Sequence, residues 1–285
     1  MIEFLYLGLV DYGEALRLQE ELVELRRADR IGNVLLLLEH PPVLTLGRNA
    51  NRANVLASDE LLAARGVTLH QINRGGDVTY HGPGQLVGYP IFDLRSLKKP
   101  GGGRMGPVDF VREMEEALIR LCAAYGVRSG RLAGLTGVWC PVGAHALDEE
   151  HGGGQGSGKI GAIGIHVSRG IISHGFAFNV TTKLEDFRLI NPCGITDRPV
   201  TNLELETKNS GALPALEEIA YEAARQFGLV FGEEILRVKS ADELRVNAAA
   251  KLSRTETALP AEDTPMKVPP ELERLRGGGE PKVRA

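Results

Sequence analysis

A glycine-rich segment at residues 74–85 interrupts strand-like sequence in the first third of the chain. It reads RGGDVTYHGPGQ and contains four glycines and one proline. Glycine lets a backbone approach a ligand closely, because it has no Cβ. The apolar stretches on either side, 67–72 and 86–94, are typical of strands that enter and leave such a turn. We therefore expect residues 74–85 to form a pocket wall between two strands.

The remaining pattern mixes helices with short strands. Asp11 and Glu14 have the spacing of a capping box at a helix start. Apolar spacing predicts helices over 13–28, 58–65, 108–125 and 214–227, and strands over 33–40, 43–46, 138–140, 159–167 and 170–180. The last two strands form a hairpin around Ser168 and Arg169. We expect an α+β fold with a mixed, mostly antiparallel sheet packed with helices, and not a doubly wound parallel sheet.

The length of 285 residues is enough for one large domain. We place that domain at residues 1–238, followed by a C-terminal extension over 239–285. Prolines, charged residues and a triple glycine at 277–279 indicate that the extension is largely disordered from about residue 253. The glycine-rich residues 143–158 predict a mobile surface loop.

Composition argues against several classes of protein. The net charge is −4 and no run rich in lysine or arginine occurs, which argues against a nucleic-acid partner. The longest apolar stretch, residues 34–38, is too short to cross a membrane, and the first residues do not resemble a signal peptide. Only three cysteines occur, an odd and sparse set that favours a reducing cytoplasm. We therefore expect a cytoplasmic protein.

Among the three cysteines, Cys193 has the sequence context most typical of a reactive thiol. It lies in the segment NPCG, where proline and glycine allow a turn with an accessible side chain. The thiolate is the reactive form, and a nearby cation lowers the pKa of a thiol. Lys159 opens an apolar strand and is the natural cation for that task, or a relay for protons. The alternatives are a buried turn cysteine and a strand-end lysine that reaches solvent.

The other cysteines and the histidines point less directly to chemistry. Cys122 lies on the apolar face of a helix and Cys140 at a strand end, so both are expected to be core residues. Of the seven histidines, His81 is a candidate for substrate contact, His166 and His174 are expected to line or support the pocket, and His40, His70, His145 and His151 look peripheral. The spacings typical of zinc ligands and of phosphate-binding loops are absent, so no metal is expected.

Four segments together resemble the lipoyl (octanoyl) transferase family. They are residues 74–85, KIGAIGI at 159–165, HGFAFN at 174–179 and NPCGI at 191–195, in that order. Gly47 and Arg48 also resemble an early substrate-side segment of the family. The resemblance extends over about residues 3–235, and the departures are the glycine-rich insertion before Lys159 and the tail beyond about Val238.

The resemblance implies an octanoyltransferase domain over 1–238 with the fold of lipoate and biotin protein ligases. It implies that an octanoyl group passes from acyl carrier protein, through a thioester on Cys193, to a specific acceptor lysine. The implied acceptors are the lipoyl domains of 2-oxoacid dehydrogenase complexes and the H protein of glycine cleavage. Lys159 would lower the pKa of Cys193. No cofactor is implied, because exchange between thioesters is nearly isoenergetic.

The resemblance also implies which residues line the acyl pocket. They are Arg74, Gly75, Gly76, Asp77, Val78, Thr79, Tyr80, His81, Ala162, Ile163, Gly164, Gly175, Phe176 and Ala177. An apolar acyl chain gains roughly 0.8 kcal/mol for each methylene buried in such a pocket. For Asp77 the residues alone leave open a second role, with bonds to Arg74 or to backbone amides of its own loop.

Two other functions remain open. An ATP-dependent lipoate or biotin protein ligase of the same fold would form an acyl-adenylate and would need no nucleophilic cysteine. A silent acyl-binding or scaffold protein would use Cys193 and Lys159 only structurally. Activity that survives Cys193→Ala and depends strictly on ATP would favour the ligase.

Overall fold

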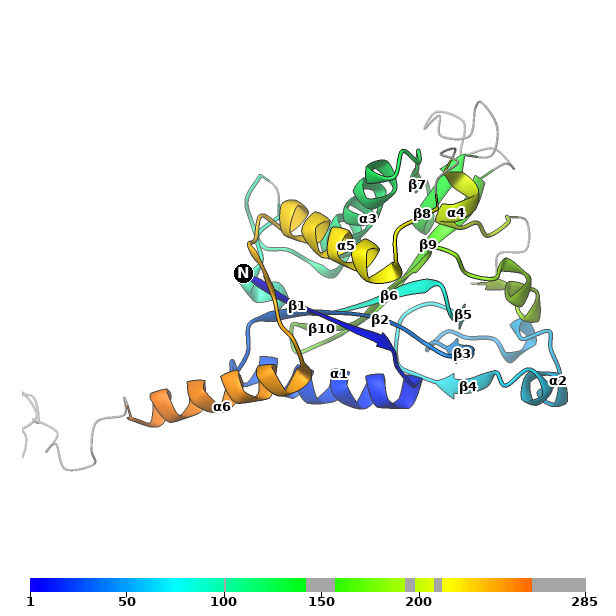
Figure 1. Ribbon diagram of the computed structural model, residues 1–285. Helices are drawn as coiled ribbons and strands as arrows, with labels where there is room; N and C mark the ends of the chain where they lie inside the picture. The colour runs from blue at the N-terminus through cyan, green and yellow to red at the C-terminus, as the bar shows by residue number, and fades with distance from the viewer. Residues whose placement is uncertain (100, 142–156, 193–197, 208–211, 258–285) are drawn as a thin grey trace, which may run out of the picture.

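The computed structural model describes residues 1–99, 101–141, 157–192, 198–207 and 212–257. Its centre is an eight-stranded sheet (Figure 1). In spatial order the strands are β11 (Ile235–Arg237), β1 (Ile2–Leu9), β2 (Asn33–Glu39), β6 (Gln85–Ile91), β10 (Ile171–Asn179), β9 (Ser157–Ser168), β8 (Leu135–Pro141) and β7 (Gly130–Leu132). β1 is parallel to β2 and β11, and the other neighbouring pairs are antiparallel. The expected α+β fold with a mixed, mostly antiparallel sheet is confirmed.

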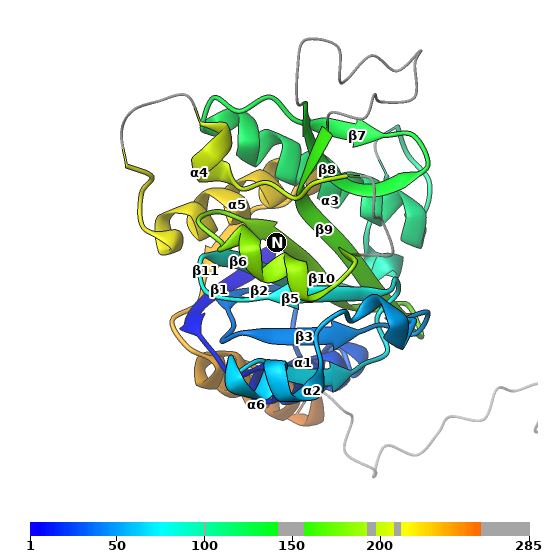
Figure 2. The same cartoon turned by 90° about the vertical axis from the view of Figure 1, so that its right-hand side faces the viewer.

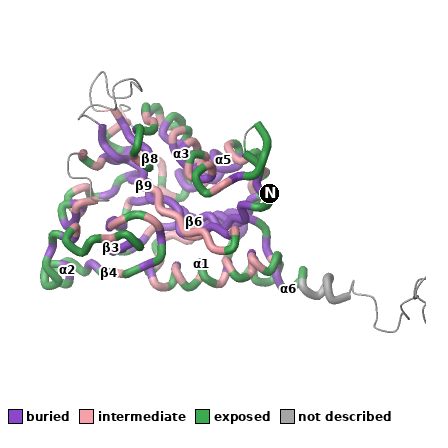
Figure 3. Tube along the Cα trace, turned by 180° about the vertical axis from the view of Figure 1, so that it is seen from behind, coloured by how far each residue is buried: buried purple, intermediate pink, exposed green. Residues whose placement is uncertain are grey.

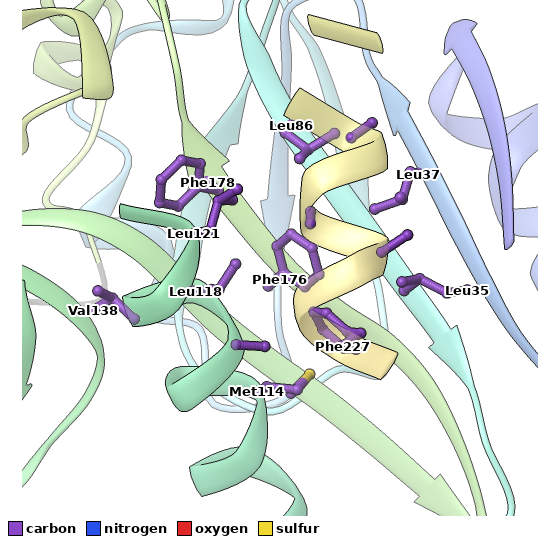
Figure 4. Packing of buried hydrophobic residues seen from close by; sticks show 14 of the residues in the cluster. Leu35, Leu37, Leu86, Met114, Leu118, Leu121, Val138, Phe176, Phe178 and Phe227 are labelled. Carbon is purple, nitrogen blue, oxygen red and sulfur yellow. The ribbon is translucent and has the colours of Figure 1, made fainter. Parts of the chain in front are cut away.

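Helices cover both faces of this sheet (Figure 1). Side chains alternate between the faces of a strand. Leu35 and Leu37 of β2 therefore pack in one core with α3 (Pro107–Ala124) and α5 (Leu216–Phe231). Leu36 of the same strand packs in a second core with α1 (Tyr12–Arg27) and α6 (Ala241–Thr257). Figure 4 shows the first core, in which Phe176 of β10 lies beside Phe227 of α5, with ring centroids 5.5 Å apart.

A second sheet of three strands lies beside the large one (Figure 2). Its strands are, in order, β4 (Thr68–Gln71), β3 (Val43–Leu46) and β5 (Val78–His81). It packs with α2 (Asp59–Ala64) and with the short 3₁₀ segment η4 (Leu184–Leu189) in a separate apolar cluster. The other short elements are η1 (Arg52–Asn54), η2 (Leu94–Ser96) and α4 (Leu203–Glu206). The glycine-rich segment thus runs from the small sheet into β6 of the large one.

Local sequence signals specify several of these elements. The Asp11 carboxylate accepts hydrogen bonds from the amides of Gly13 and Glu14, so the expected N-cap of α1 is present. The Ser58 hydroxyl caps α2 in the same way. The expected hairpin is β9 and β10, which pair antiparallel with Gly164 opposite Gly175.

Several expected boundaries differ from the observed ones. The strand expected over 86–94 ends at Ile91, and the strand expected over 138–140 is the longer β8. The loop expected over 143–158 lies outside the described residues except for Ser157 and Gly158, which begin β9. The tail expected to be largely disordered from about residue 253 begins within α6, which continues to Thr257. Residues 258–285 lie outside the described chain.

Burial is concentrated in the central strands, and α1 and α6 present exposed outer faces (Figure 3). β2 is buried from Asn33 to Leu38, as expected for a strand with helices on both sides. Among the described helices, none is both long enough and apolar enough to cross a membrane.

Candidate active site

The β9–β10 hairpin provides a surface of small residues. Ala162 pairs with Ala177 and Gly164 pairs with Gly175, and residues paired directly across two strands share a face. These four residues therefore form a shallow, small-residue face. Bulkier neighbours such as Phe176 belong to the core beneath α3 and α5 (Figure 4). This alternation leaves space on one side of the hairpin without weakening the core on the other.

A cavity lies over that face, and we call it the acyl cavity after the ligand that the sequence resemblance implies. Its empty volume is about 470 Å³, part of which is open to solvent. Eleven of the residues expected to bind substrate line it: Arg74, Gly75, Gly76, Thr79, His81, Ala162, Ile163, Gly164, Gly175, Phe176 and Ala177. Tyr12, Tyr89 and His174 complete the lining. The fold therefore brings together three segments that are far apart in the sequence.

The other three expected pocket residues do not line this cavity. Val78 and Tyr80 lie on the opposite side of β5 from Thr79 and His81, as strand alternation requires. The Tyr80 hydroxyl donates to Asp186 at 2.9 Å. Asp77 holds its own loop together, because its carboxylate accepts from the amides of Asn51 and Val78 and from the Asn54 side chain. The structural alternative left open for Asp77 is the one observed.

Arg74 ties the glycine-rich segment to the small sheet. Its guanidinium donates to the carbonyl oxygen of Thr45 at 2.7 Å and to the Thr45 hydroxyl at 2.9 Å, and the residue is buried. Gly47 packs under this loop, where an added Cβ would lie 2.4 Å from the carbonyl oxygen of Gly76. On the other side, the amide of Gly75 donates to the carbonyl oxygen of Ile165 in β9 at 2.9 Å. The segment therefore spans from the small sheet to the hairpin.

Lys159 lies near the start of β9 in a smaller, adjoining cavity. This cavity also contains Pro192, and it shares Thr79, Ala162 and Ala177 with the acyl cavity. The Lys159 ammonium lies 5.1 Å from the centre of the buried Trp139 ring, close enough for a cation–π contact. The three shared lining residues place the Lys159 cavity directly beside the acyl cavity.

A glycine leaves room for the Lys159 side chain. An added Cβ at Gly137 would lie 2.7 Å from Cε of Lys159 and 2.5 Å from the carbonyl oxygen of Gly161. Gly137 also has φ +124°, a backbone conformation that favours glycine. Its amide donates to the carboxylate of Glu115 in α3 at 2.9 Å. Glu115 is fully buried and is paired with the guanidinium groups of Arg112 and Arg131.

A polar network connects the acyl cavity with the Lys159 strand. The side-chain nitrogen of Gln85 donates to the side-chain oxygen of Asn179 at 2.9 Å, and the side-chain oxygen of Gln85 lies 2.7 Å from Nδ1 of His81. Since the Gln85 amide group is the donor toward Asn179, its oxygen accepts from His81, which fixes hydrogen on Nδ1. Asn179 in turn donates to the carbonyl oxygen of Thr201, whose amide donates to the carbonyl oxygen of Lys159.

The buried histidines of this region are held neutral. Burial lowers the pKa of His81 to about 3 and that of His40 to about 4. Burial also lowers the pKa of His174 to about 4, with the nearby charge of Arg74 as the next cause. His40 Nδ1 donates to the carbonyl oxygen of Val10, so its Nε2 accepts from the Tyr89 hydroxyl at 2.7 Å. His40 thus supports the cavity through Tyr89, although we expected it to be peripheral.

Two of the three cysteines belong to the core, as expected. Cys122 and Cys140 are buried and free, and they pack in the cluster beneath α3 and α5. The contact with Cys122, together with burial, raises the pKa of the Cys140 thiol. Cys193 lies outside the described residues. Its neighbour in sequence, Pro192, is described and lines the cavity that contains Lys159.

Tyr12 and Tyr89 are the lining residues that the sequence did not reveal. Tyr12 is the first residue of α1, and Tyr89 lies in the middle of β6. The Tyr12 ring stacks on His81, with centroids 6.2 Å apart. Each tyrosine has an ordinary position in an apolar pattern, so no local signal distinguishes it from a core residue.

Within the described chain, no group of three or more His, Cys, Asp or Glu side chains has an arrangement suited to a metal ion.

Comparisons with known proteins show which family this chain resembles. Residues 11–225 match the family model of the lipoyl protein ligase A/B catalytic domain. The chain is 59% identical to an octanoyltransferase of Acidobacterium capsulatum, over 86% of this chain and 96% of the relative. It is 48% identical to an octanoyltransferase of Koribacter versatilis, over 96% of this chain and 97% of the relative.

Solved structures show the same fold at low sequence identity. A bipartite lipoate protein ligase from Thermoplasma acidophilum is 17% identical with a TM-score of 0.62, and covers 89% of this chain and 93% of its own. A lipoate-protein ligase A bound with ATP is 18% identical with a TM-score of 0.61, and covers 89% of this chain and 95% of its own.

Proposed function

The chain belongs to the octanoyltransferase family, within the wider group defined by the lipoyl protein ligase A/B catalytic domain, and we propose that it transfers octanoyl groups in protein lipoylation. The observation that carries the proposal is the acyl cavity, floored by Ala162, Gly164, Gly175 and Ala177 and adjoining the cavity around Lys159. An apolar acyl chain fits such a floor, and each buried methylene contributes roughly 0.8 kcal/mol to binding.

The first half-reaction moves the acyl group to Cys193. The Cys193 thiolate attacks the thioester carbonyl of octanoyl-acyl carrier protein, a new carbon–sulfur bond forms, and the carrier thiolate leaves. Support comes from Pro192, the residue bonded to Cys193, which lines the same cavity as Lys159. The Lys159 cation is the group that would stabilise the Cys193 thiolate, because a nearby positive charge favours the anionic form of a thiol.

The second half-reaction moves the acyl group to the acceptor. A neutral acceptor lysine attacks the Cys193 thioester, an amide bond forms, and the thiolate of Cys193 is released. Within this proposal Lys159 donates a proton to the departing Cys193 sulfur and then takes up the proton that the attacking amine loses. The acceptors proposed are the lipoyl domains of 2-oxoacid dehydrogenase complexes and the H protein of glycine cleavage, and the location proposed is the cytoplasm.

Transfer to an isolated lipoyl domain tests the proposal. Incubation with octanoyl-acyl carrier protein, without ATP, is expected to add one octanoyl mass to the acceptor lysine. Lys159→Met keeps an unbranched side chain, one atom shorter, but removes its charge, and is expected to lower the rate at least ~100-fold, within the usual range for loss of an acid–base group.

The same assay separates this function from its alternatives. Product formed from free octanoate and ATP, and none from the carrier thioester, would identify a ligase. Binding of the acyl chain without product under either condition would identify a silent binding protein. Both results contradict the proposal.

A further inference from the structure

A second cavity lies at the far end of the hairpin from Lys159. Its empty volume is about 770 Å³, part of which is open to solvent. It is lined by one side of α1, by the outer parts of β9 and β10 and by Asn73; its lining residues include Leu16, Val23, Asn73, His166, Ile171 and His174. Among the residues that line these two cavities, only His174 lines both this distal cavity and the acyl cavity.

The His174 imidazole lies on the face of β10 that borders the two cavities. The alternation of side chains along a strand would instead place it on the core face. Ile172 and Phe176, two residues before and after, pack in the core beneath α3 and α5. A regular strand would place residue 174 on that same face. Instead, Nε2 of His174 contacts the Asn73 side-chain oxygen at 2.7 Å, and Asn73 lines the distal cavity.

An unusual backbone conformation accompanies this change of face. His174 has φ +55°, in the left-handed region that non-glycine residues rarely adopt. Its amide donates to the buried Gln19 side chain of α1 at 3.0 Å, which anchors this conformation. Strained positions of this kind persist where the surrounding structure holds them, and they cluster at functional sites.

Residues of both cavities face the imidazole. After burial, the causes that lower the pKa of His174 are Arg74, which lines the acyl cavity, and His166, which lines the distal cavity. His174 is only 3% exposed, and its Nδ1 has no hydrogen-bond partner among the described residues. The imidazole therefore lies between the two cavities as a buried partition.

The distance along β10 between the Lys159 end of the acyl cavity and His174 is close to the length of an eight-carbon chain. Ala162 and Ala177 belong also to the Lys159 cavity, so they mark the end where the acyl carbonyl would lie. From Ala177 to His174 is three residues of strand, or about 10 Å. Seven carbon–carbon bonds of about 1.5 Å at near-tetrahedral angles give an extended length of roughly 9 Å.

We propose that His174 is the residue that limits acyl chain length, because its side chain closes the acyl cavity against the distal cavity. This rests on the proposed octanoyl transfer. Without the imidazole, a longer chain would pass into the distal cavity beside Leu16, Val23 and Ile171, which provide its apolar lining.

The test compares octanoyl- and dodecanoyl-acyl carrier protein as donors to a lipoyl domain. His174→Gly removes the partition and suits the positive φ. Each buried methylene contributes roughly a factor of four to binding. The ratio of kcat/KM for dodecanoyl over octanoyl is therefore expected to rise at least ~10-fold over wild type. His166→Ala, in a residue that lines only the distal cavity, is the matched control and is expected to leave the ratio unchanged.

A second variant and a binding measurement keep the test decisive. His174→Asn also tolerates positive φ and serves if His174→Gly fails to fold. Calorimetric binding of dodecanoate and octanoate to the same variants should show the same change in preference. An unchanged ratio in a folded His174 variant, or an equal rise in His166→Ala, overturns the proposal. Absence of octanoyl transfer by the wild type would instead overturn the proposed function, while the binding data would still report on the partition.

Discussion

At the scale of single residues, the position of Lys159 depends on a neighbour that has no side chain. Gly137 lies directly beneath the Lys159 methylenes, and its backbone is fixed by the buried carboxylate of Glu115. The lysine thereby stays over the Trp139 ring at the edge of the cavity that also contains Pro192. Its place is therefore set by the close approach of Gly137 and by the contact with Trp139.

Gly137→Ala is expected to reduce octanoyl transfer strongly, because the new methyl group displaces Lys159. We expect at least ~10-fold loss of kcat, with ~1–3 kcal/mol loss of unfolding free energy from backbone strain. Gly134→Ala is the matched control: Gly134 also has positive φ, +76°, but an added Cβ meets nothing within 4 Å. Equal loss of activity in the two variants, measured with octanoyl-acyl carrier protein, would contradict this account of Gly137.

The buried histidines predict how stability depends on pH. The folded-state pKa of His40, about 4, is below its ordinary value, so the unfolded chain binds the proton more readily. The contribution of the neutral, buried His40 to the free energy of unfolding is therefore complete above about pH 6.5 and is lost as the pH falls toward 4. Each such histidine contributes at most about 1.4 kcal/mol per pH unit in that window.

Urea denaturation at several pH values between 7 and 4.5 measures this dependence. In His40→Gln, the unfolding free energy is expected to fall less steeply with decreasing pH than in the wild type, because one buried imidazole is removed. Parallel plots of unfolding free energy against pH for the two proteins would show that His40 does not contribute to the pH dependence.

At the scale of elements, the β9–β10 hairpin divides large from small residues between its faces. The register, with Ala162 opposite Ala177, places the small pairs together and forms the floor of the acyl cavity. The opposite face contributes Phe176 and Phe178 to the main core. One hairpin thus provides both core packing and binding space.

Ala177→Leu is expected to fill the acyl cavity. Transfer of octanoyl should fall roughly 10- to 100-fold, because two or three methylenes of the chain lose their buried surface, whereas transfer of butyryl should fall much less. Ala177→Gly enlarges the cavity and should retain octanoyl transfer. Assays with carrier-protein thioesters of four and eight carbons measure this, and equal losses for both chains in Ala177→Leu would argue against the cavity as the acyl site.

Much of this element structure could be predicted from local sequence. The cap at Asp11 and the alternation on both sides of Ser168 and Arg169 specify α1 and the hairpin, because these signals act between near neighbours. Strand alternation could also have excluded Val78 and Tyr80 from the cavity. It could not have placed His174, whose left-handed backbone changes its face, nor Tyr12, which reaches the cavity from another element.

At the scale of the whole molecule, α6 packs on the same face of the sheet as α1 (Figure 1). Leu244 and Ala248 are buried there, and the Arg245 guanidinium pairs with Glu21 of α1 at 2.6 Å. The first part of the C-terminal extension is therefore part of the packed structure. The sequence did not predict this, because α6 is amphipathic only weakly and its contacts are with residues more than 200 positions earlier.

Leu244→Ala is expected to lower the unfolding free energy by about 2–4 kcal/mol, because it leaves a cavity in the second core. Val246→Ala, in a residue that is 65% exposed, is the matched control and should change it by less than about 0.5 kcal/mol. Chemical denaturation compares the two. A small effect of Leu244→Ala would show that α6 does not pack there in solution.

The central claim is that the octanoyl group passes through a covalent intermediate on one sulfur. Intact-protein mass spectrometry after incubation with octanoyl-acyl carrier protein, without an acceptor, measures it directly. We expect one added octanoyl group on the wild type that hydroxylamine removes, and none on Cys193→Ser, whose Cys122 and Cys140 are intact. An unmodified wild type that still transfers octanoyl to a lipoyl domain, or an adduct that persists in Cys193→Ser, would contradict it.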